Sequence, residues 1–345
     1  MQISNSQYFF LFLITYSFVG LLTPVMRKTA ISRQILDIPI SSHKSHTKAV
    51  PYLGGIAILI GVVFVSYSAL IFSGLTFSNF WLATSVLGPA VAMGLVGLLD
   101  DIKNLSPLPR FIGQSIAGLV VALSLVASKN VANPTGSTYV DVLITVIWVV
   151  GITNSINFFD NLDGGAAGTA AVTTIFLTFL ALKNDQSFIA AIAIVVSGGT
   201  LGFLVWNRTP ARIYMGDAGA LFLGVLLATL TIRLNPQTQT QIASFATPTL
   251  LLAVPILDTC VAVFSRIRRG VSPFQGGKDH LSHRLIRLGV SRKLAAIMLW
   301  LMSGFFALLA VLVSLVSEQL EIGLVITAFI IWLIFFIYFY RTEDE

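Results

Sequence analysis

The stretch VIWVVGITNSINFFDNLDGGAAGTAAVTTIFLTFLALK, residues 146–183, places a short acidic segment between two long apolar runs. Each run approaches the roughly 20 apolar residues that a helix needs to cross the hydrocarbon core of a bilayer. The segment between them carries Asp160 and Asp163, followed by two glycines. The pattern predicts membrane-spanning helices near 139–159 and 165–182, joined by a polar loop.

The composition extends this interpretation to the whole chain. Of its 345 residues, 56% are hydrophobic and only 10% are charged, whereas soluble domains carry about 25% charged residues. We therefore predict an all-α integral membrane protein, with residues 1–345 forming a single polytopic domain. The lone Cys260 excludes an intrachain disulfide, and the net charge of +6 indicates basic cytoplasmic loops rather than a nucleic-acid partner.

Nine further apolar stretches bring the predicted number of transmembrane helices to eleven. The shortest of them lies at 218–232. The full set of further spans is 7–26, 51–73, 79–99, 111–128, 187–206, 218–232, 243–264, 294–316 and 322–340.

Basic residues predict the orientation of these spans, because cytoplasmic loops carry an excess of Lys and Arg. Eighteen of the 21 such residues fall on one set of alternating loops, and only Lys129, Lys183 and Arg233 fall on the other. The N-terminus is therefore expected outside and the C-terminus in the cytoplasm of a plasma (inner) membrane protein. The external loops are too short to form a domain, so the active site is expected on the cytoplasmic loops. The histidines lie on the same side: His43, His46, His280 and His283.

Acidic residues gather at the predicted cytoplasmic ends of the spans. A single aspartate there would be explained as a solvated helix cap. Several close together repel one another unless a cation lies among them, and carboxylate oxygens suit Mg²⁺. The cluster therefore predicts a hard-metal site. Its members are Asp100, Asp101, Asp160, Asp163 and Asp217.

Two of these acidic segments have an informative spacing. NSINFFDNLDGG places Asn154, Asn157, Asp160 and Asp163 three residues apart, so on a helical backbone they would share one face. In MGDAG, glycines flank Asp217, which favours close approach of the backbone to a ligand. For the glycines after Asp163, ligand approach and helix packing both remain open.

The loop SRIRRGVSPFQGGKDHLSHRL, residues 265–285, supplies the counter-charge in His280, His283 and Arg284. Arginine binds phosphate oxygens in a bidentate manner, although the earlier arginines of this loop are equally explained by lipid headgroups. Asp258, farther into its span, is expected to support the site. Metal-binding acids and phosphate-binding cations at a membrane surface indicate phosphoryl transfer between a soluble donor and a lipid.

Taken together, these segments resemble the polyprenyl-phosphate N-acetylhexosamine-1-phosphate transferase family. The similarity runs from DIPISSHKSHTKAVPYLGG (37–55) to DHLSHRL (279–285) and includes the paired aspartates, the NxxNxxDNxDG segment and the MGDxG turn, in the family's order. The resemblance implies an eleven-helix fold. It also implies transfer of the sugar 1-phosphate of a UDP-N-acetylhexosamine to undecaprenyl or another polyprenyl phosphate, with release of UMP and the start of cell-envelope glycan synthesis.

The resemblance further implies roles for individual residues. Asp217 would be the principal ligand of Mg²⁺ (or Mn²⁺), with Asn157 beside it. Asp100 and Asp101 would lie near the lipid phosphate, one of them as base or orienting group. The residues that would bind the donor are Asn154, Asn157, Asp160 and Asp163 in the nucleotide pocket, Tyr214 stacked on uracil, and His280, His283 and Arg284 on the diphosphate or the sugar.

Some alternatives stay open. Ser282 and Asn104 depart from the phospho-MurNAc-pentapeptide transferase branch, which usually has a histidine and a lysine there, so UDP-GlcNAc is the favoured donor. That branch remains the second hypothesis. An ion-coupled transporter is disfavoured, because its acids would lie near the bilayer midplane on broken helices. Direct attack by the lipid phosphate and a covalent aspartyl intermediate both remain open, and a homodimer is allowed.

Overall fold

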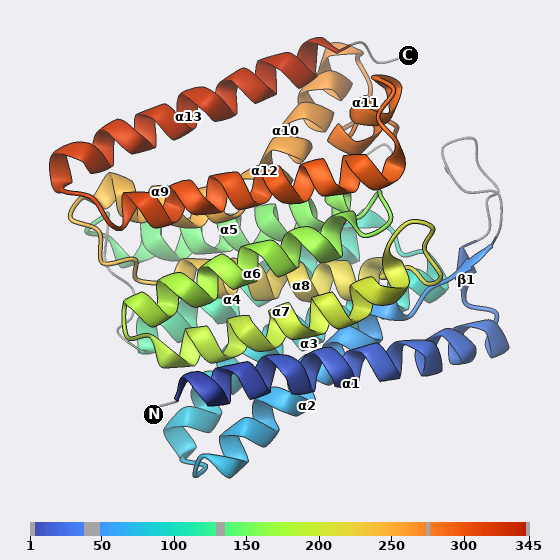
Figure 1. The fold of residues 1–345 in the computed structure, drawn as a ribbon, viewed down its shortest axis with the longest axis horizontal. Coiled ribbons are helices and arrows are strands. Elements are labelled where there is room, and N and C mark those ends of the chain that lie inside the picture. The colour runs from blue at the N-terminus through green and yellow to red at the C-terminus, as the bar shows by residue number, and fades with distance from the viewer. Residues whose placement is uncertain (1–3, 38–48, 129–134, 274–276, 343–345) are drawn as a thin grey trace.

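The computed structural model describes residues 4–37, 49–128, 135–273 and 277–342, so His43, His46 and Lys129 lie outside the described residues. Within these ranges the chain forms thirteen helices and two short strands (Figure 1). The elements are α1 (Asn5–Ser32), β1 (Leu36–Asp37), β2 (Val50–Pro51), α2 (Gly54–Phe72), α3 (Phe77–Lys103), α4 (Pro107–Ala127), α5 (Thr138–Phe159), α6 (Gly165–Lys183), α7 (Ser187–Asn207), α8 (Gly216–Arg233), α9 (Gln241–Leu251), α10 (Ala253–Arg268), α11 (Leu281–Arg287), α12 (Arg292–Val313) and α13 (Glu318–Arg341).

The helices confirm an all-α membrane architecture with about eleven spans. Among the described residues, ten helices are long and apolar enough to cross a bilayer, and α9 with α10 supplies an eleventh as a bent pair. The short stretch at 218–232 proves to be the full-length helix α8. The two strands pair antiparallel over two residues each, which is the only sheet among the described residues.

The prediction of one continuous helix at 243–264 is wrong, because α9 and α10 meet at an angle of 76°. Pro255 lies in the first turn of α10, where it cannot donate to the carbonyl of Leu251 and its ring would collide with that carbonyl in a continuous helix. The hydroxyl of Thr173 in α6 donates to the Leu251 carbonyl instead, at 3.0 Å. The break is therefore satisfied inside the protein, as a membrane interior requires.

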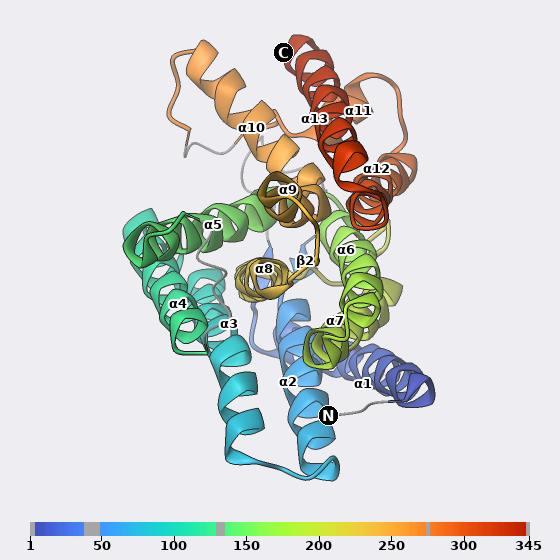
Figure 2. The same cartoon turned by 90° about the vertical axis from the view of Figure 1, so that its left-hand side faces the viewer.

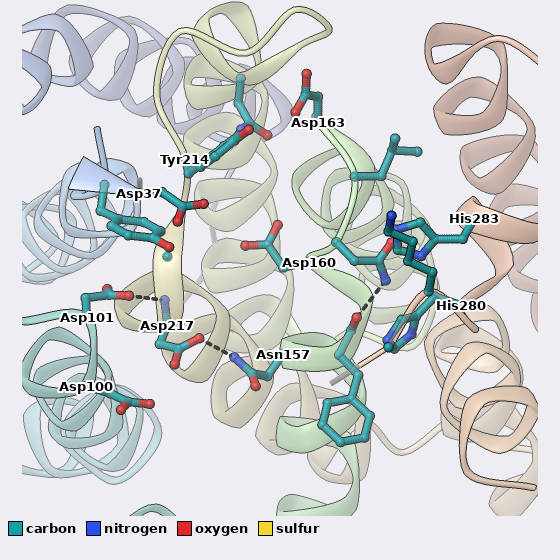
Figure 3. A pocket seen from close by; sticks show the side chains of 18 of the residues that line it. Asp37, Asp100, Asp101, Asn157, Asp160, Asp163, Tyr214, Asp217, His280 and His283 are labelled. Carbon is teal, nitrogen blue, oxygen red and sulfur yellow. Dashed lines mark hydrogen bonds between the residues drawn. The ribbon is translucent and has the colours of Figure 1, made fainter. Parts of the chain in front are cut away.

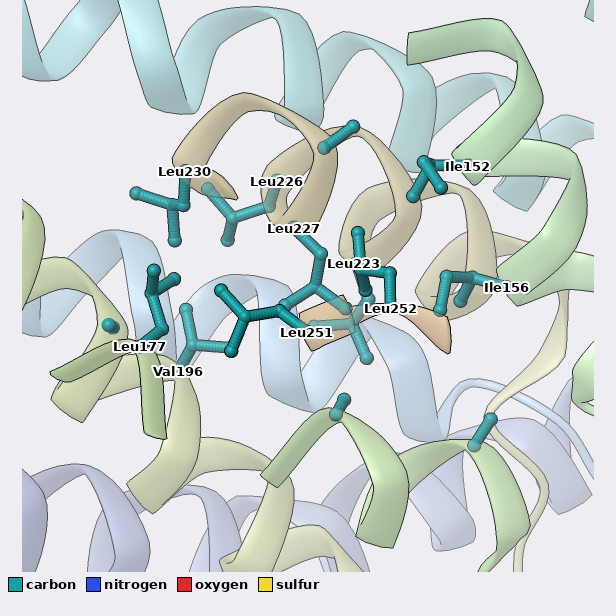
Figure 4. Packing of buried hydrophobic residues seen from close by; sticks show 14 of the residues in the cluster. Ile152, Ile156, Leu177, Val196, Leu223, Leu226, Leu227, Leu230, Leu251 and Leu252 are labelled. Carbon is teal, nitrogen blue, oxygen red and sulfur yellow. The ribbon is translucent and has the colours of Figure 1, made fainter. Parts of the chain in front are cut away.

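Helix α8 forms the centre of the bundle, with α2 to α7 arranged around it (Figure 2). Sixteen of its eighteen residues are buried, as expected for a helix that is apolar on all sides. Leu223, Leu226 and Leu227 contribute to the core beside Leu251 and Leu252 of the α9–α10 break (Figure 4). Small residues at the helix contacts let the backbones of neighbouring helices approach one another closely.

Two ends of the bundle matter for function. We call the end where α3, α5 and α7 finish and α8 begins the acidic end, and the other the opposite end (Figure 1). At the acidic end the backbone of Tyr214 pairs with β2, its N–H donating to Pro51 O at 2.9 Å. The carbonyl of Tyr214 accepts from Gly54 N at 3.0 Å. These bonds hold the loop before α8 against the start of α2.

Candidate active site

A cavity of ≈ 810 Å³ opens at the acidic end of the bundle. Aspartates line one side of it, and the histidines lie across from them on the segment around α11 (Figure 3). The lining aspartates are Asp37, Asp100, Asp101, Asp160, Asp163 and Asp217. The lining cations are Arg110, Arg266, Lys278, Arg287 and Arg292. The predicted cluster is thus brought together, and Asp37 joins it.

Asp101 caps the central helix. Its two carboxylate oxygens accept hydrogen bonds from the N–H groups of Asp217 at 2.9 Å and Ala218 at 3.0 Å, at the first turn of α8. A carboxylate there satisfies orphan N–H groups and complements the helix dipole. Gly216 permits this approach: its φ is +72°, and a Cβ would lie 2.7 Å from Asp101 Oδ2. The arrangement favours an orienting role for Asp101 over that of a base.

Arg110 connects the other two acids of this wall. Its guanidinium lies 2.7 Å from Asp100 Oδ2 and 3.3 Å from Asp217 Oδ2. Asp100 is 5% exposed and also accepts from Leu105 N at 2.6 Å. The Asp217 side chain is 31% exposed, so it remains open to the cavity. Arg110 therefore screens the repulsion between two carboxylates that the sequence places 117 residues apart on α3 and α8.

Asp217 and Asn157 fit a partial metal site. Asn157 Nδ2 donates to Asp217 Oδ1 at 2.7 Å, which places its amide beside the carboxylate (Figure 3). Among the described residues, no three His, Cys, Asp or Glu side chains converge into a complete metal cage. Mg²⁺ commonly uses one or two carboxylates and takes its other ligands from substrate phosphates and water. The donor set therefore fits an ion that binds together with a diphosphate.

The acids after α5 do not share a helical face, contrary to the sequence prediction, because α5 ends at Phe159. Asp163 instead accepts a hydrogen bond from Ala211 N at 3.0 Å and so tethers the loop before α8. Asp160 lies in the cavity, where burial first, and then the charges of Asp101 and Asp163, raise the pKa of its carboxyl to about 7. The turn between them brings both acids to the site from outside the helix.

Asp160→Asn is expected to stabilise the empty protein at pH 8. Because the folded state holds the proton up to about 7 and the unfolded state only to 3.8, the wild type loses stability as pH rises between these values. Asparagine cannot ionise, so its advantage should be small below pH 4, grow as the pH rises, and reach a few degrees at pH 8. Thermal unfolding in detergent with EDTA measures this, with Glu318→Gln as a control. An advantage that does not grow with pH would contradict the assignment.

Asn154 is the first predicted site residue that the structure does not place at the cavity. It lies one turn deeper in α5, where its Nδ2 donates to Gln114 Oε1 at 2.7 Å and to Val150 O at 2.8 Å. Asn154 is absent from the lining of the cavity. The pair with Gln114 ties α5 to α4, so the structure assigns Asn154 to helix packing.

Tyr214 lines the cavity as predicted, and a second ring lies beside it. The ring centroids of Tyr52 and Tyr214 are 6.3 Å apart. Burial, followed by the charge of nearby Asp163, raises the pKa of the Tyr214 hydroxyl above its usual range, so it stays protonated. The two rings offer apolar faces, and their hydroxyl groups can form hydrogen bonds, on the acidic side of the cavity.

His280 and His283 line the opposite wall of the cavity. His280 Nδ1 lies 2.7 Å from Asp258 Oδ2, while Asp258 Oδ1 accepts from Leu281 N at 2.7 Å. Asp258 thus orients His280 from a buried position, the supporting role expected for it. Burial, and secondly the charge of His280, lower the pKa of His283 to about 4, so its ring is neutral at physiological pH. Its Nδ1 is buried, and no described residue forms a hydrogen bond with it.

A buried ion pair braces this wall. Arg266 Nε and Nη2 lie 2.8 Å and 2.7 Å from the two oxygens of Asp279, and Nη1 donates to Pro273 O at 2.7 Å. Burial opposes the ionisation of Asp279, but the bonds and charge of Arg266 hold its pKa below the usual range. Because Arg266 is 3% exposed, headgroup binding no longer explains it.

The prediction that Arg284 binds substrate is corrected by its burial. Its guanidinium is fully buried, does not line the cavity, and donates to Asp279 O at 2.9 Å and to Ser265 Oγ at 2.7 Å. It also donates to Phe339 O at 2.8 Å and to the carbonyl of Thr342. Arg284 therefore joins the loop, α10 and the end of α13.

Comparisons with known proteins identify the family of the chain. A family model described as glycosyl transferase family 4 matches residues 81–235, which run from α3 to α8. A probable undecaprenyl-phosphate N-acetylglucosaminyl 1-phosphate transferase of Bacillus subtilis is 32% identical, over 91% of this chain and 87% of the relative. The chain belongs to glycosyl transferase family 4. The resemblance found in the motifs is thereby confirmed.

Two further relatives of this glycosyl transferase family 4 member show the kinds of transferase to which it is similar. A decaprenyl-phosphate N-acetylglucosaminephosphotransferase of Mycolicibacterium smegmatis is 34% identical, over 76% of this chain and 71% of the relative. A phospho-N-acetylmuramoyl-pentapeptide-transferase of Staphylococcus carnosus is 30% identical, over 66% of this chain and 75% of the relative. Similarity to the first kind thus extends over more of the chain.

Several lining residues of this family member were missed in the sequence. No site role was predicted for Asp37, Tyr52 or Arg110. The first two lie in the stretch 37–55, and Arg110 was counted only among the basic residues of the cytoplasmic loops. Asn161 also lines the cavity and accepts a hydrogen bond from the Ser282 hydroxyl. The presence of Ser282 where a histidine is common was the available signal for this contact.

Proposed function

We propose that this family member transfers N-acetylhexosamine 1-phosphate, with GlcNAc 1-phosphate the favoured group, from a UDP-sugar to undecaprenyl or another polyprenyl phosphate. The products are UMP and a lipid-pyrophosphoryl sugar that starts cell-envelope glycan synthesis. One observation carries the proposal: aspartates and cations line the same cavity at the end of the bundle, with His280 and His283 across from the aspartates (Figure 3). The similarity to a probable undecaprenyl-phosphate N-acetylglucosaminyl 1-phosphate transferase supports it.

The donor diphosphate is complementary to the cations of the cavity. Lys278, Arg287 and Arg292 are among its lining residues, where they can neutralise phosphate oxygens that would be repelled by the aspartates. The neutral His283 offers the same diphosphate, or the sugar, a hydrogen-bonding nitrogen. Tyr214 lies at the acidic end, where we place the uracil ring against its face.

Asp217 and Asn157 are the residues that would hold Mg²⁺, or Mn²⁺ in its place. When bound, such an ion neutralises charge on the diphosphate and makes the phosphorus more electrophilic. Asp101 and Asp100 are already engaged with the α8 N-terminus and with Arg110. Their part is to fix Asp217 in position rather than to bind the ion.

In the reaction we favour, an oxygen of the lipid phosphate attacks the β-phosphorus of the donor. The new bond joins that oxygen to the β-phosphorus, the bond from the β-phosphorus to the bridging oxygen breaks, and UMP leaves with the electron pair. The second pKa of a phosphomonoester is about 6, so the lipid phosphate is mostly dianionic and needs no strong base. Arg110, which lies beside Asp217, would orient the lipid phosphate. A covalent aspartyl intermediate is the second route.

We place the acidic end in the cytoplasm, with the N-terminus outside and the C-terminus inside a plasma (inner) membrane. The distribution of Lys and Arg supports this orientation. It gives the cavity access to a soluble nucleotide sugar and to the lipid phosphate at the same surface. The exposed apolar residues along α1 and α13 suit contact with lipid.

UMP release from two donors tests the proposal. Purified protein with undecaprenyl phosphate and Mg²⁺ should release UMP from UDP-GlcNAc and form a lipid of the corresponding mass, whereas UDP-MurNAc-pentapeptide should give little. UMP from the pentapeptide donor alone would move the protein to the peptidoglycan branch, the runner-up that the Staphylococcus carnosus relative keeps open. With neither donor active, in Mg²⁺ or Mn²⁺, the transferase proposal would fail.

A further inference from the structure

A second cavity, of ≈ 850 Å³, lies at the opposite end of the bundle. It is lined by the end of α8 at the centre of the bundle, and by the starts of α5 and α7 and by α9, which lie around α8 in Figure 2. The transferase chemistry proposed for the acidic end uses none of these residues. The lining mixes apolar side chains with polar ones, and its ionisable residues are the buried Arg233 and Asp141 and the exposed Asp185.

Arg233 is a buried cation without a carboxylate partner in the part of the chain that the structure describes. It is the last residue of α8 and is 6% exposed. Within the described ranges its guanidinium reaches two hydroxyls, those of Ser124 at 3.4 Å and Ser128 at 3.2 Å. The carbonyl end of α8 attracts a cation, but an ionisable residue this deeply buried in a membrane protein generally serves a ligand or pathway. The side chain has bonding capacity left for an anion.

Asp141, in the same lining, is a buried carboxylate that, within the described part of the chain, lacks a hydrogen-bond donor for one of its oxygens. It lies in the first turn of α5 and is 4% exposed. Oδ1 accepts from Thr135 Oγ1 at 2.8 Å, whereas Oδ2 is buried and has no hydrogen-bond partner among the described residues. A buried carboxylate oxygen left unpaired is costly unless a donor arrives from a ligand or from water. One cavity therefore offers both an unfilled site for an anion and an unfilled site for a cationic donor.

The rim of this cavity indicates where a ligand enters. Ile144 of α5 and Phe245 of α9 both line it, and they are 37% and 44% exposed. In a multi-pass membrane protein, exposed apolar residues along the spans contact acyl chains. A ligand held here can thus keep a charged group inside while apolar chains leave between α5 and α9. A soluble anion would make no use of that rim.

The geometry points to a binding site for a zwitterionic phospholipid with a primary amine, of the phosphatidylethanolamine type. Its phosphate would bind Arg233 and its ammonium would bind Asp141 Oδ2, with the acyl chains passing Ile144 and Phe245. A phosphatidylglycerol could use only the first contact. A quaternary choline headgroup could not donate a hydrogen bond to Asp141.

Lipid retention measured by native mass spectrometry tests the site. Delipidated full-length protein in detergent is offered phosphatidylethanolamine and phosphatidylglycerol together. The wild type should retain one phosphatidylethanolamine with about a tenfold preference, the factor expected from one charge-assisted hydrogen bond. Asp141→Asn should lose the preference but keep binding phosphatidylglycerol. Arg233→Gln should lose about tenfold in retention of both lipids, and Arg233→Lys should keep part of it.

Lys183→Gln is the matched control, because Lys183 is an exposed cation at the same end, outside the cavity lining. Equal retention of the two lipids by the wild type, or a preference unchanged by Asp141→Asn, would overturn the proposal. The comparison of the two lipids on the wild-type protein needs no variant. It therefore tests the proposal even if Arg233→Gln unfolds. Displacement of the lipid by inorganic phosphate at low millimolar concentration would identify a soluble-anion site and overturn the lipid assignment.

Discussion

Asp217→Asn is expected to lower the turnover number for UMP release by about a thousandfold, a loss typical of removing one group that stabilises charge in a transition state. Asparagine keeps the size of the side chain and can still accept from Asn157, now at 2.7 Å. It removes the negative charge that would hold a divalent cation on the open side of the cavity. The measurement is UMP release from UDP-GlcNAc and undecaprenyl phosphate across a Mg²⁺ titration.

Folding controls give this result its meaning. Asp217 repels the neighbouring carboxylates in the empty protein, so removing its charge should not destabilise the fold. The variant should therefore elute from size exclusion at the wild-type volume. Glu318→Gln, on the exposed first turn of α13, is a charge-matched control that should keep full activity. Retention of more than a small fraction of wild-type turnover by Asp217→Asn, at any Mg²⁺ concentration, would remove Asp217 from the metal site.

Arg110→Met is expected to have the second largest effect, a fall in turnover of about a hundredfold, within the range measured for loss of a charge-stabilising group. Arg110 lies 2.7 Å from Asp100 and 3.3 Å from Asp217. Without it, the two carboxylates repel each other and the incoming lipid phosphate. The KM for the lipid acceptor should rise together with the fall in turnover.

Arg110→Lys separates charge from geometry. Lysine restores a positive charge as a single point but cannot reach both carboxylates with a rigid fork, so its activity should fall between those of the wild type and Arg110→Met. Lys28→Met removes an exposed cation from α1, away from the cavity, and should change neither parameter. Wild-type kinetics in Arg110→Met would show that the contact with Asp217 has no part in the reaction.

Most of the fold could be predicted because each membrane span is encoded by one continuous stretch of the sequence. About 20 apolar residues in a row suffice to predict a helix, and α8 was found in this way even though its predicted stretch, 218–232, is short. The break between α9 and α10 depends on Pro255 together with Thr173, which accommodates the freed carbonyl from another helix. A window of hydropathy averages over the proline and contains no information about α6.

The site was predictable to the extent that its residues lie at the ends of spans. Asp100, Asp101, Asp160, Asp163 and Asp217 do line one cavity. Asn154 and Arg284 do not, since each belongs to a recognisable motif but points into helix packing. Arg110 was read only as a charge of the basic side, because its partners lie on two other helices.

The sequence by itself determined that this chain is a polytopic membrane protein with an acidic cluster and a basic loop. Hydrophobic length, motif order and charge depend on neighbours in the chain, so no coordinates are needed to recognise them. Only the tertiary structure decided which acids remain open to the cavity. Asp101 is engaged by the α8 N-terminus, while Asp217 is 31% exposed. The availability of a carboxylate depends on the hydrogen-bond donors that the fold brings to it from distant segments.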